Sequence, residues 1–244
     1  MKMLMLMGGT RPLDTVNNYP LFLTEIDGRL IIEDILENYS VQGFSECIFC
    51  AKQDDIESFN VDAIIRSILP DARIVPVLGK TGGASCTALL AQEFIDSDEE
   101  LVIVSVDDYI SCDVREILRK FSEKNADVGL VSFTSVHPRY SFIKRDGTGA
   151  VCQIAEKKPV SRDALASFYY FRHGSDFVSA VQDEIRKDSA INGAFYISHA
   201  LNELILRRKR IETVKIANEH FHSFKTERQL ATYIMKYKQS GDEA

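Results

Sequence analysis

Short apolar runs alternate along the chain with longer segments in which apolar residues recur at helical spacing. The runs end at polar or glycine-containing turns, which is typical of strands. Strands are expected at 3–7, 47–51, 73–77, 101–106, 128–136, 142–144, 151–155, 168–171 and 211–216. Helices are expected at 30–39, 54–69, 81–95, 113–124, 175–187, 197–206 and from 227 onward. This alternation predicts an α/β protein in which helices cover a mostly parallel sheet.

The run at 101–106 is apolar throughout and rich in β-branched residues. Such a run is typical of a central strand that is buried on both faces, and open α/β sheets bind ligands at the carboxyl ends of these strands. A glycine-containing turn between 142–144 and 151–155 predicts a hairpin in the second half. We therefore expect a single-domain, Rossmann-like α/β/α sandwich with a mixed, mostly parallel sheet.

Composition excludes several classes of protein. The 244 residues are 45% hydrophobic and 27% charged, with only 13 Gly and 6 Pro, so a collagenous or disordered chain is excluded. A formal net charge of −7 argues against a nucleic-acid-binding protein, which carries a basic footprint. The apolar N-terminal run has the length of one strand and predicts neither a signal peptide nor a membrane span, so a cytoplasmic protein is expected.

The cysteines do not predict a disulfide framework, because their number, 5, is odd and they are scattered. Cys47 and Cys50 form a CxxC pattern, but they fall on an expected strand. There, side chains at i and i+3 point to opposite faces, which argues against a zinc or redox site.

A first glycine pair, Gly8-Gly9-Thr10-Arg11, directly follows the first expected strand. Glycines let the backbone approach a ligand closely, and successive N–H groups can cradle a phosphate. The guanidinium of Arg11 would add a fixed positive fork for a phosphate oxygen. The same residues are also compatible with an ordinary turn.

A second glycine pair, Thr81-Gly82-Gly83-Ala84, opens an expected helix. The free N–H groups and the dipole of a helix N-terminus favour an anion or the edge of a base. A tight strand-to-helix turn with a hydroxyl cap is the alternative interpretation.

Asp107 and Asp108 follow the expected central strand. Two adjacent carboxylates at the end of a buried strand repel each other unless a cation or several donors compensate them. Mg²⁺ suits this position, because it binds through one or two carboxylates together with substrate phosphates. A solvated aspartate that caps the next helix is the alternative.

A charged loop, Glu156-Lys157-Lys158-Pro159, follows another expected strand. A glutamate can accept hydrogen bonds from sugar hydroxyls, and a neighbouring lysine can meet a phosphate as a point charge. A solvated charged loop is the alternative.

In their order along the chain, these segments resemble the sugar-phosphate nucleotidylyltransferase family, also called the sugar-nucleotide pyrophosphorylases. The resemblance covers nearly the whole chain and includes segments 20–29, 192–197 and 221–227. It implies a GT-A-like fold with a nucleotide-binding part at about 1–135 and an acceptor-binding part at about 136–238, followed by a frayed tail at 239–244. It leaves a homodimer open.

The resemblance also implies an activity. A phosphorylated small molecule, most simply a sugar phosphate for capsule or other surface polysaccharide, attacks the α-phosphorus of a nucleoside triphosphate (NTP), and pyrophosphate leaves. Mg²⁺ or Mn²⁺ would bind Asp107 and Asp108. Catalysis is assigned to Arg11, Asp107 and Lys157. The nucleotide is assigned to the two glycine segments, and the acceptor to Glu156, Lys157, Lys158 and Asn192.

The chain departs from the family pattern at three places. The loop between Gly9 and Arg11 is shorter, the lysine beside Pro20 is absent, and Ser223 and Lys225 stand where a second metal-binding aspartate is expected. Candidates for the missing lysine contact are Lys80, Lys157 and Lys158.

Two other functions stay open. A glycosyltransferase of similar fold would use Val106-Asp107-Asp108 to bind the metal of a sugar nucleotide, but it needs no Gly-Gly-Thr-Arg loop. A non-catalytic paralogue would bind a nucleotide without turnover.

Overall fold

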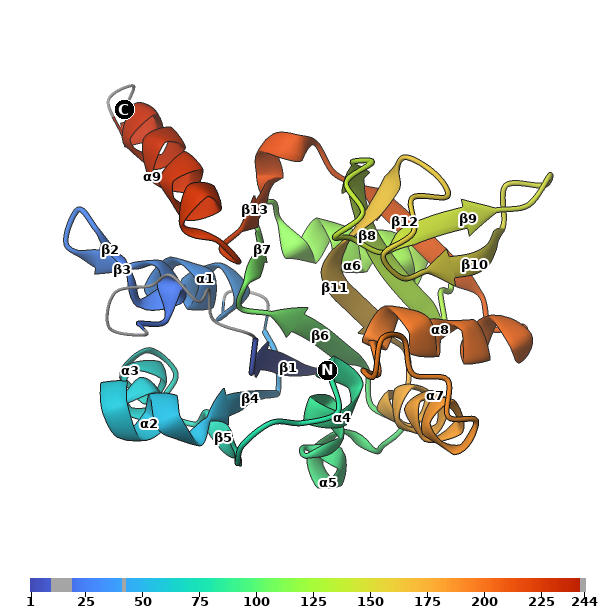
Figure 1. The fold of residues 1–244 in the computed structure, drawn as a ribbon, viewed down its shortest axis with the longest axis horizontal. Helices are drawn as coiled ribbons and strands as arrows, with labels where there is room; N and C mark the ends of the chain where they lie inside the picture. Colours follow the sequence, from blue (N-terminus) through green and yellow to red (C-terminus); the bar gives the residue numbers. More distant parts are fainter. Residues whose placement is uncertain (10–18, 41–42, 242–244) are drawn as a thin grey trace.

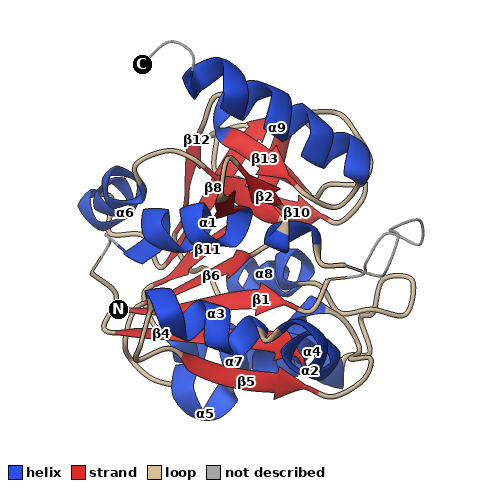
Figure 2. Ribbon diagram, turned by 90° about the vertical axis from the view of Figure 1, so that its left-hand side faces the viewer, coloured by secondary structure: helices blue, strands red, loops and turns tan. Residues whose placement is uncertain are grey.

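The computed structural model describes residues 1–9, 19–40 and 43–241. Its main sheet lies between helices on both faces (Figure 1). Four parallel strands stand side by side in the order β5-β4-β1-β6, and three of them, β1, β5 and β6, can be followed to the same edge in Figure 2. These strands are β1 (Lys2–Met7), β4 (Glu46–Lys52), β5 (Arg73–Val77) and β6 (Leu101–Ser105).

An antiparallel part continues the sheet beyond β6. Strand β11 pairs with both β6 and β8, and β12 runs parallel to β8. Near the carboxyl end of β6, β7 pairs with β13. The strands of this part are β7 (Asp108–Ile110), β8 (Val128–Thr134), β9 (Phe142–Arg145), β10 (Val151–Ala155), β11 (Asp163–Phe171), β12 (Ile211–Lys215) and β13 (Phe221–Ser223). A separate small sheet contains β2 (Glu25–Ile26) and β3 (Arg29–Leu30).

Two apolar cores fill the space between the sheet and its helices. Alternate side chains of β1 enter opposite cores, with Met3 and Met5 in one and Leu4 and Leu6 in the other. The first core contains residues of α1 (Ile31–Ser40), α2 (Gln53–Phe59), α3 (Val61–Ile68), α6 (Val114–Glu123) and α9 (Glu227–Gly241). The second contains residues of α4 (Ala84–Leu89), α5 (Gln92–Ile95), α7 (Gly174–Arg186) and α8 (Ile197–Leu206). The expected α/β/α sandwich with a mixed sheet is confirmed.

Several elements differ from the prediction, and the expected helix at 81–95 is two helices, α4 and α5. The expected helix at 54–69 is two helices, because Asn60 adopts a left-handed backbone (φ 51°), which asparagine tolerates better than most residues. Strand β11 begins at Asp163, five residues earlier than expected. Helix α9 continues to Gly241, so residues 239–241 are helical where fraying was expected. Within the described ranges, no helix combines the length and apolar character needed to span a bilayer.

Candidate active site

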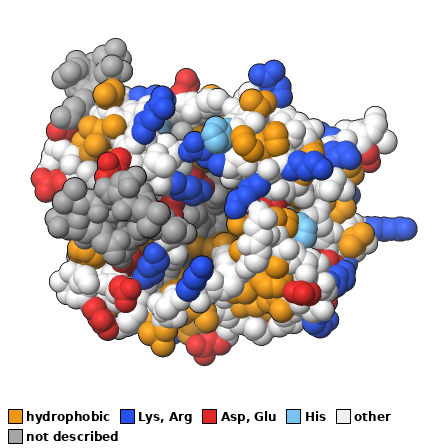
Figure 3. Space-filling view, viewed as in Figure 1, with side chains coloured by type: hydrophobic (Ala, Val, Ile, Leu, Met, Phe, Trp, Pro, Cys, Tyr) orange, Lys and Arg blue, Asp and Glu red, His pale blue; other side chains and the backbone are white. Residues whose placement is uncertain are grey.

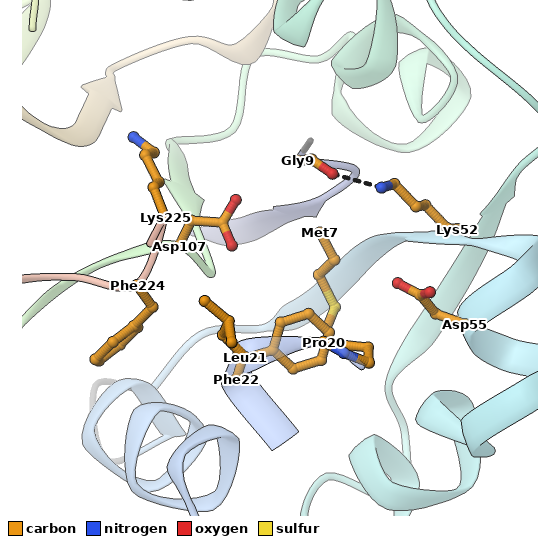
Figure 4. A pocket seen from close by; sticks show the side chains of 10 residues that line it. All are labelled: Met7, Gly9, Pro20, Leu21, Phe22, Lys52, Asp55, Asp107, Phe224 and Lys225. Carbon is orange, nitrogen blue, oxygen red and sulfur yellow. Dashed lines mark hydrogen bonds between the residues drawn. The ribbon is translucent and has the colours of Figure 1, made fainter. Parts of the chain in front are cut away.

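Three functional segments meet at the carboxyl edge of the parallel strands. Gly8 and Gly9 follow β1, Lys52 ends β4, and Asp107 comes two residues after β6. Because neighbouring parallel strands end at the same edge, these residues surround one pocket (Figure 4). The described residues that line it are Met7, Gly9, Pro20, Leu21, Phe22, Lys52, Asp55, Asp107, Phe224 and Lys225.

Gly9 and Asp107 are in direct contact. A Cβ atom added to Gly9 would lie 2.0 Å from Oδ2 of Asp107, so a larger residue would displace the carboxylate. Gly8 lies against α4, where its Cβ would be 3.5 Å from Cγ2 of Thr87. The structure therefore brings the first glycine pair and Asp107 together, whereas Thr10 and Arg11 fall outside the described residues.

The carboxylate of Asp107 is partly buried and points into the pocket. Burial raises its pKa to about 6, with a further contribution from the neighbouring Asp108. Lys225 and Lys52 oppose this rise, because each places a positive charge near the carboxylate. The backbone around Asp107 is fixed by a 2.8 Å hydrogen bond from the Phe224 N–H to its carbonyl.

Asp108 has a different environment from Asp107. It begins β7, is 2% exposed, and is not among the described residues that line the pocket. Its Oδ2 accepts hydrogen bonds from the Ser167 hydroxyl at 2.6 Å and from the Lys225 ammonium. Desolvation of the ammonium group beside Asp108 lowers the pKa of Lys225, but the negative charge of the Asp108 carboxylate outweighs this effect, so the lysine pKa is raised. The expected carboxylate pair is thus divided, with Asp107 at the pocket and Asp108 in an internal ion pair.

The second glycine pair lies against the segment that contains Asn192. The Phe195 N–H donates to the carbonyl of Gly82 at 2.8 Å, and the Ser85 N–H donates to the carbonyl of Phe195 at 3.2 Å. Gly83 has φ 119°, and a Cβ atom there would lie 2.4 Å from the Phe195 carbonyl oxygen. Glycine is required here because two backbones pass within contact distance.

We expect Gly83→Ala to lower the free energy of unfolding by about 2 kcal/mol, because it combines an unfavourable φ with a backbone clash. Urea denaturation measures this loss. Gly147→Ala is the control, since a Cβ atom at Gly147 meets nothing within 4 Å. Equal midpoints for the two variants would show that the contact with Phe195 does not constrain the turn.

The residues assigned to the acceptor lie around the start of α8. Glu156 accepts hydrogen bonds from the hydroxyls of Ser141 and Ser198, the latter at 2.5 Å. The ammonium of Lys157 donates to the Tyr196 hydroxyl at 2.5 Å and lies 4.5 Å from the centre of that ring. Lys158 and Asn192 are exposed.

The lysines that line the pocket are not those proposed from the sequence. Lys80, Lys157 and Lys158 are absent from its described lining, whereas Lys52 and Lys225 belong to it. Lys52 had a usable signal, because it directly follows the expected strand at 47–51, which ends at the same edge of the sheet as the strand before Asp107. Lys225 had a signal only through the resemblance, since it stands where a second metal-binding aspartate is expected. Its contact with Asp108 joins segments far apart in the sequence and has no local signal.

The pocket fits a small hard cation at Asp107. Its volume is about 20 Å³, which is room for a water molecule or an ion. Carboxylate oxygens are ligands that Mg²⁺ prefers. Among the residues that the structure describes, no three His, Cys, Asp or Glu side chains are grouped as a metal site. A cation here would need further oxygens from substrate phosphates, as is common for Mg²⁺.

Solved structures with this fold include several nucleotide-sugar enzymes. A nucleoside-diphosphate-sugar pyrophosphorylase from Vibrio cholerae RC9 has a TM-score of 0.77 at 18% identity, covering 96% of this chain and 100% of its own. A UDP-glucose pyrophosphorylase in complex with UDP-glucose has a TM-score of 0.78 at 16% identity, covering 98% of both chains. A putative glucose-1-phosphate thymidylyltransferase from Bacillus anthracis has a TM-score of 0.75 at 15% identity, covering 95% of this chain and 94% of its own. At these identities the likeness shows a shared fold.

The family itself is shown by the sequence. No curated protein matches the chain. The family model described as nucleotidyl transferase matches residues 4–205, which include Gly9, Lys52 and Asp107 but not Lys225. This match covers most of the chain and confirms the predicted resemblance. The protein belongs to the nucleotidyl transferase family.

Proposed function

We propose that the protein transfers a nucleotidyl group from an NTP to a sugar phosphate, or to a similar phosphorylated small molecule, with release of pyrophosphate. The observation that carries this proposal is the contact between Gly9 and Asp107 at the carboxyl edge of the sheet. This contact places a carboxylate suited to a divalent cation beside a backbone turn that a phosphate can approach closely. Family membership supports the same reaction class.

In the proposed reaction, an oxygen of the acceptor phosphate attacks the α-phosphorus of the NTP. The bond from that phosphorus to the β-phosphate oxygen breaks, and its electron pair leaves with pyrophosphate. The residues of the chain orient the two phosphates and place charge beside them, which is the main source of rate in phosphoryl transfer. Gly8 and Gly9 would admit the triphosphate, and the second glycine pair would contact the base.

Asp107 would hold Mg²⁺ or Mn²⁺, and the bound ion would neutralise phosphate charge. Glu156 and Lys157, with Lys158 and Asn192 nearby, would contact the acceptor. Structures of similar fold that are named as sugar-nucleotide enzymes favour a sugar phosphate as the acceptor. We further propose a cytoplasmic role in making precursors of capsule or another surface polysaccharide, and a homodimer is compatible with this role.

The test is pyrophosphate release from each of the common NTPs with Mg²⁺ and a panel of phosphorylated sugars and polyols. We expect turnover that requires one particular NTP and one particular acceptor. The variant Asp107→Asn serves as the negative control. Binding of a sugar nucleotide but of no NTP would instead indicate a glycosyltransferase. NTP binding without turnover across the panel would indicate a non-catalytic paralogue.

A further inference from the structure

Lys52 is the pocket lysine closest to the first glycine turn. It ends β4, and its ammonium group donates a hydrogen bond to the carbonyl oxygen of Gly9. Lys52 is half-buried, and it stands at the junction where β4 passes directly into α2. A side chain that starts from such a junction is held more precisely than one on a loop.

Two lysines provide positive charge near Asp107. In Figure 4, Asp107 lies between Lys225 on one side and Lys52 with Gly9 on the other. Both lysines stabilise the ionised form of Asp107, so both ammonium groups act on the pocket. Lys225 is bound to the buried carboxylate of Asp108, which takes up its charge. Lys52 donates to the Gly9 carbonyl, so of the two lysines it is the one whose ammonium group lies directly at the turn where a ligand would bind.

A polyphosphate requires such charge in this protein. The described pocket also contains the carboxylates of Asp55 and Asp107, and the chain carries a net charge of −7, so a triphosphate meets repulsion without local cations. Figure 3 shows the face of the molecule that is seen in Figure 1, and lysine and arginine side chains lie on several sides of its middle. An ammonium group has three N–H donors and can bind a backbone carbonyl and a phosphate oxygen together.

We propose that Lys52 is a catalytic residue that binds a non-bridging oxygen of the NTP where the triphosphate crosses the turn at Gly9. This inference rests on the proposed function. As the acceptor oxygen bonds to the α-phosphorus and the bond to the β-phosphate breaks, negative charge shifts toward the leaving pyrophosphate. Lys52 stabilises that charge as a hydrogen-bond donor and keeps its proton throughout, so no base or other reactant is needed.

The test compares Lys52→Gln and Lys52→Arg with the unchanged protein, and Lys144→Gln serves as the control because Lys144 is exposed on β9. We expect Lys52→Gln to lower kcat about 100-fold, the loss typical of removing one donor to a transition-state oxygen. It should weaken binding of the preferred NTP about 10-fold by calorimetry, as expected for a hydrogen bond from a charged group. Lys52→Arg should recover part of both effects. The midpoints of thermal unfolding of the three variants should agree with that of the unchanged protein.

The matching nucleoside, which lacks phosphates, separates a phosphate contact from a general change in the pocket. It should bind the unchanged protein and Lys52→Gln equally. Values of kcat and NTP affinity within threefold of the unchanged protein would overturn the role of Lys52. If no acceptor gives turnover, the proposed function fails, and the phosphate contact of Lys52 is then decided by the NTP and nucleoside affinities.

Discussion

Asp107→Asn is expected to lower turnover at least about 100-fold while making the substrate-free protein more stable at pH 8. The loss of activity follows because asparagine keeps the shape of the side chain but not the charge that would hold a cation beside the phosphates. The gain in stability follows because the ionised carboxylate is partly buried and its pKa is raised to about 6. Opposite changes in activity and stability would mark Asp107 as a functional charge rather than a structural one.

The pH dependence of this stability gain can be derived from the pKa. A carboxyl whose pKa rises on folding favours the folded state below its unfolded pKa of 3.8, and this benefit is lost as the pH rises through about 6. The difference between these pKa values corresponds to at most about 3 kcal/mol. Urea denaturation in EDTA should therefore show an advantage for Asp107→Asn of about 1–3 kcal/mol at pH 8 and little difference at pH 4. Lower stability of the variant at pH 8 would contradict this account.

Lys225→Met is expected to lower the free energy of unfolding by about 3–5 kcal/mol, because it leaves the Asp108 carboxylate buried without its cation. The Asp108 side chain is 1% exposed, and after the substitution its carboxylate would keep the Ser167 hydroxyl as a donor but lose its neutralising charge. The double variant Lys225→Met/Asp108→Asn should recover most of this loss, since the buried charge is then removed as well. Denaturant unfolding of both single variants and the double variant measures the coupling.

Lys120→Met provides a matched control for this comparison. The side chains of Lys120 and Lys225 are equally exposed, 43% each, but Lys120 pairs with Glu116, whose side chain is 54% exposed. A surface pair of this kind contributes about 0.5 kcal/mol or less. Equal losses for the two lysine variants would show that the burial of Asp108 does not determine the strength of its ion pair.

Elements of the fold were predictable where their signals are local. Strand β5 and helix α8 have the expected bounds, since each is a run with one clear periodicity between turn residues. The start of β11 was missed because the polar residues Asp163 and Ser167 interrupt its apolar pattern. Ser167 also has a left-handed backbone (φ 52°), within a stretch of irregular pairing between β11 and β8.

The candidate site was predictable only where strand ends define it. Gly9 and Asp107 each follow an expected parallel strand, so the shared edge of the sheet brings them together. No local pattern distinguishes Asp107 from Asp108. The difference arises because Lys225 neutralises Asp108 across 117 residues of sequence, and such a contact has no local signal.

The pairing of β13 with β7 makes the reactive edge dependent on a segment that is synthesised after every parallel strand. The amide that holds the Asp107 carbonyl belongs to Phe224, and the ammonium that neutralises Asp108 belongs to the next residue. A nascent chain of which only residues 1–220 have emerged from the ribosome already contains every parallel strand but neither of these groups. Nascent or prematurely terminated polypeptides should therefore remain inert, and nucleotide consumption should begin only once translation has passed this point.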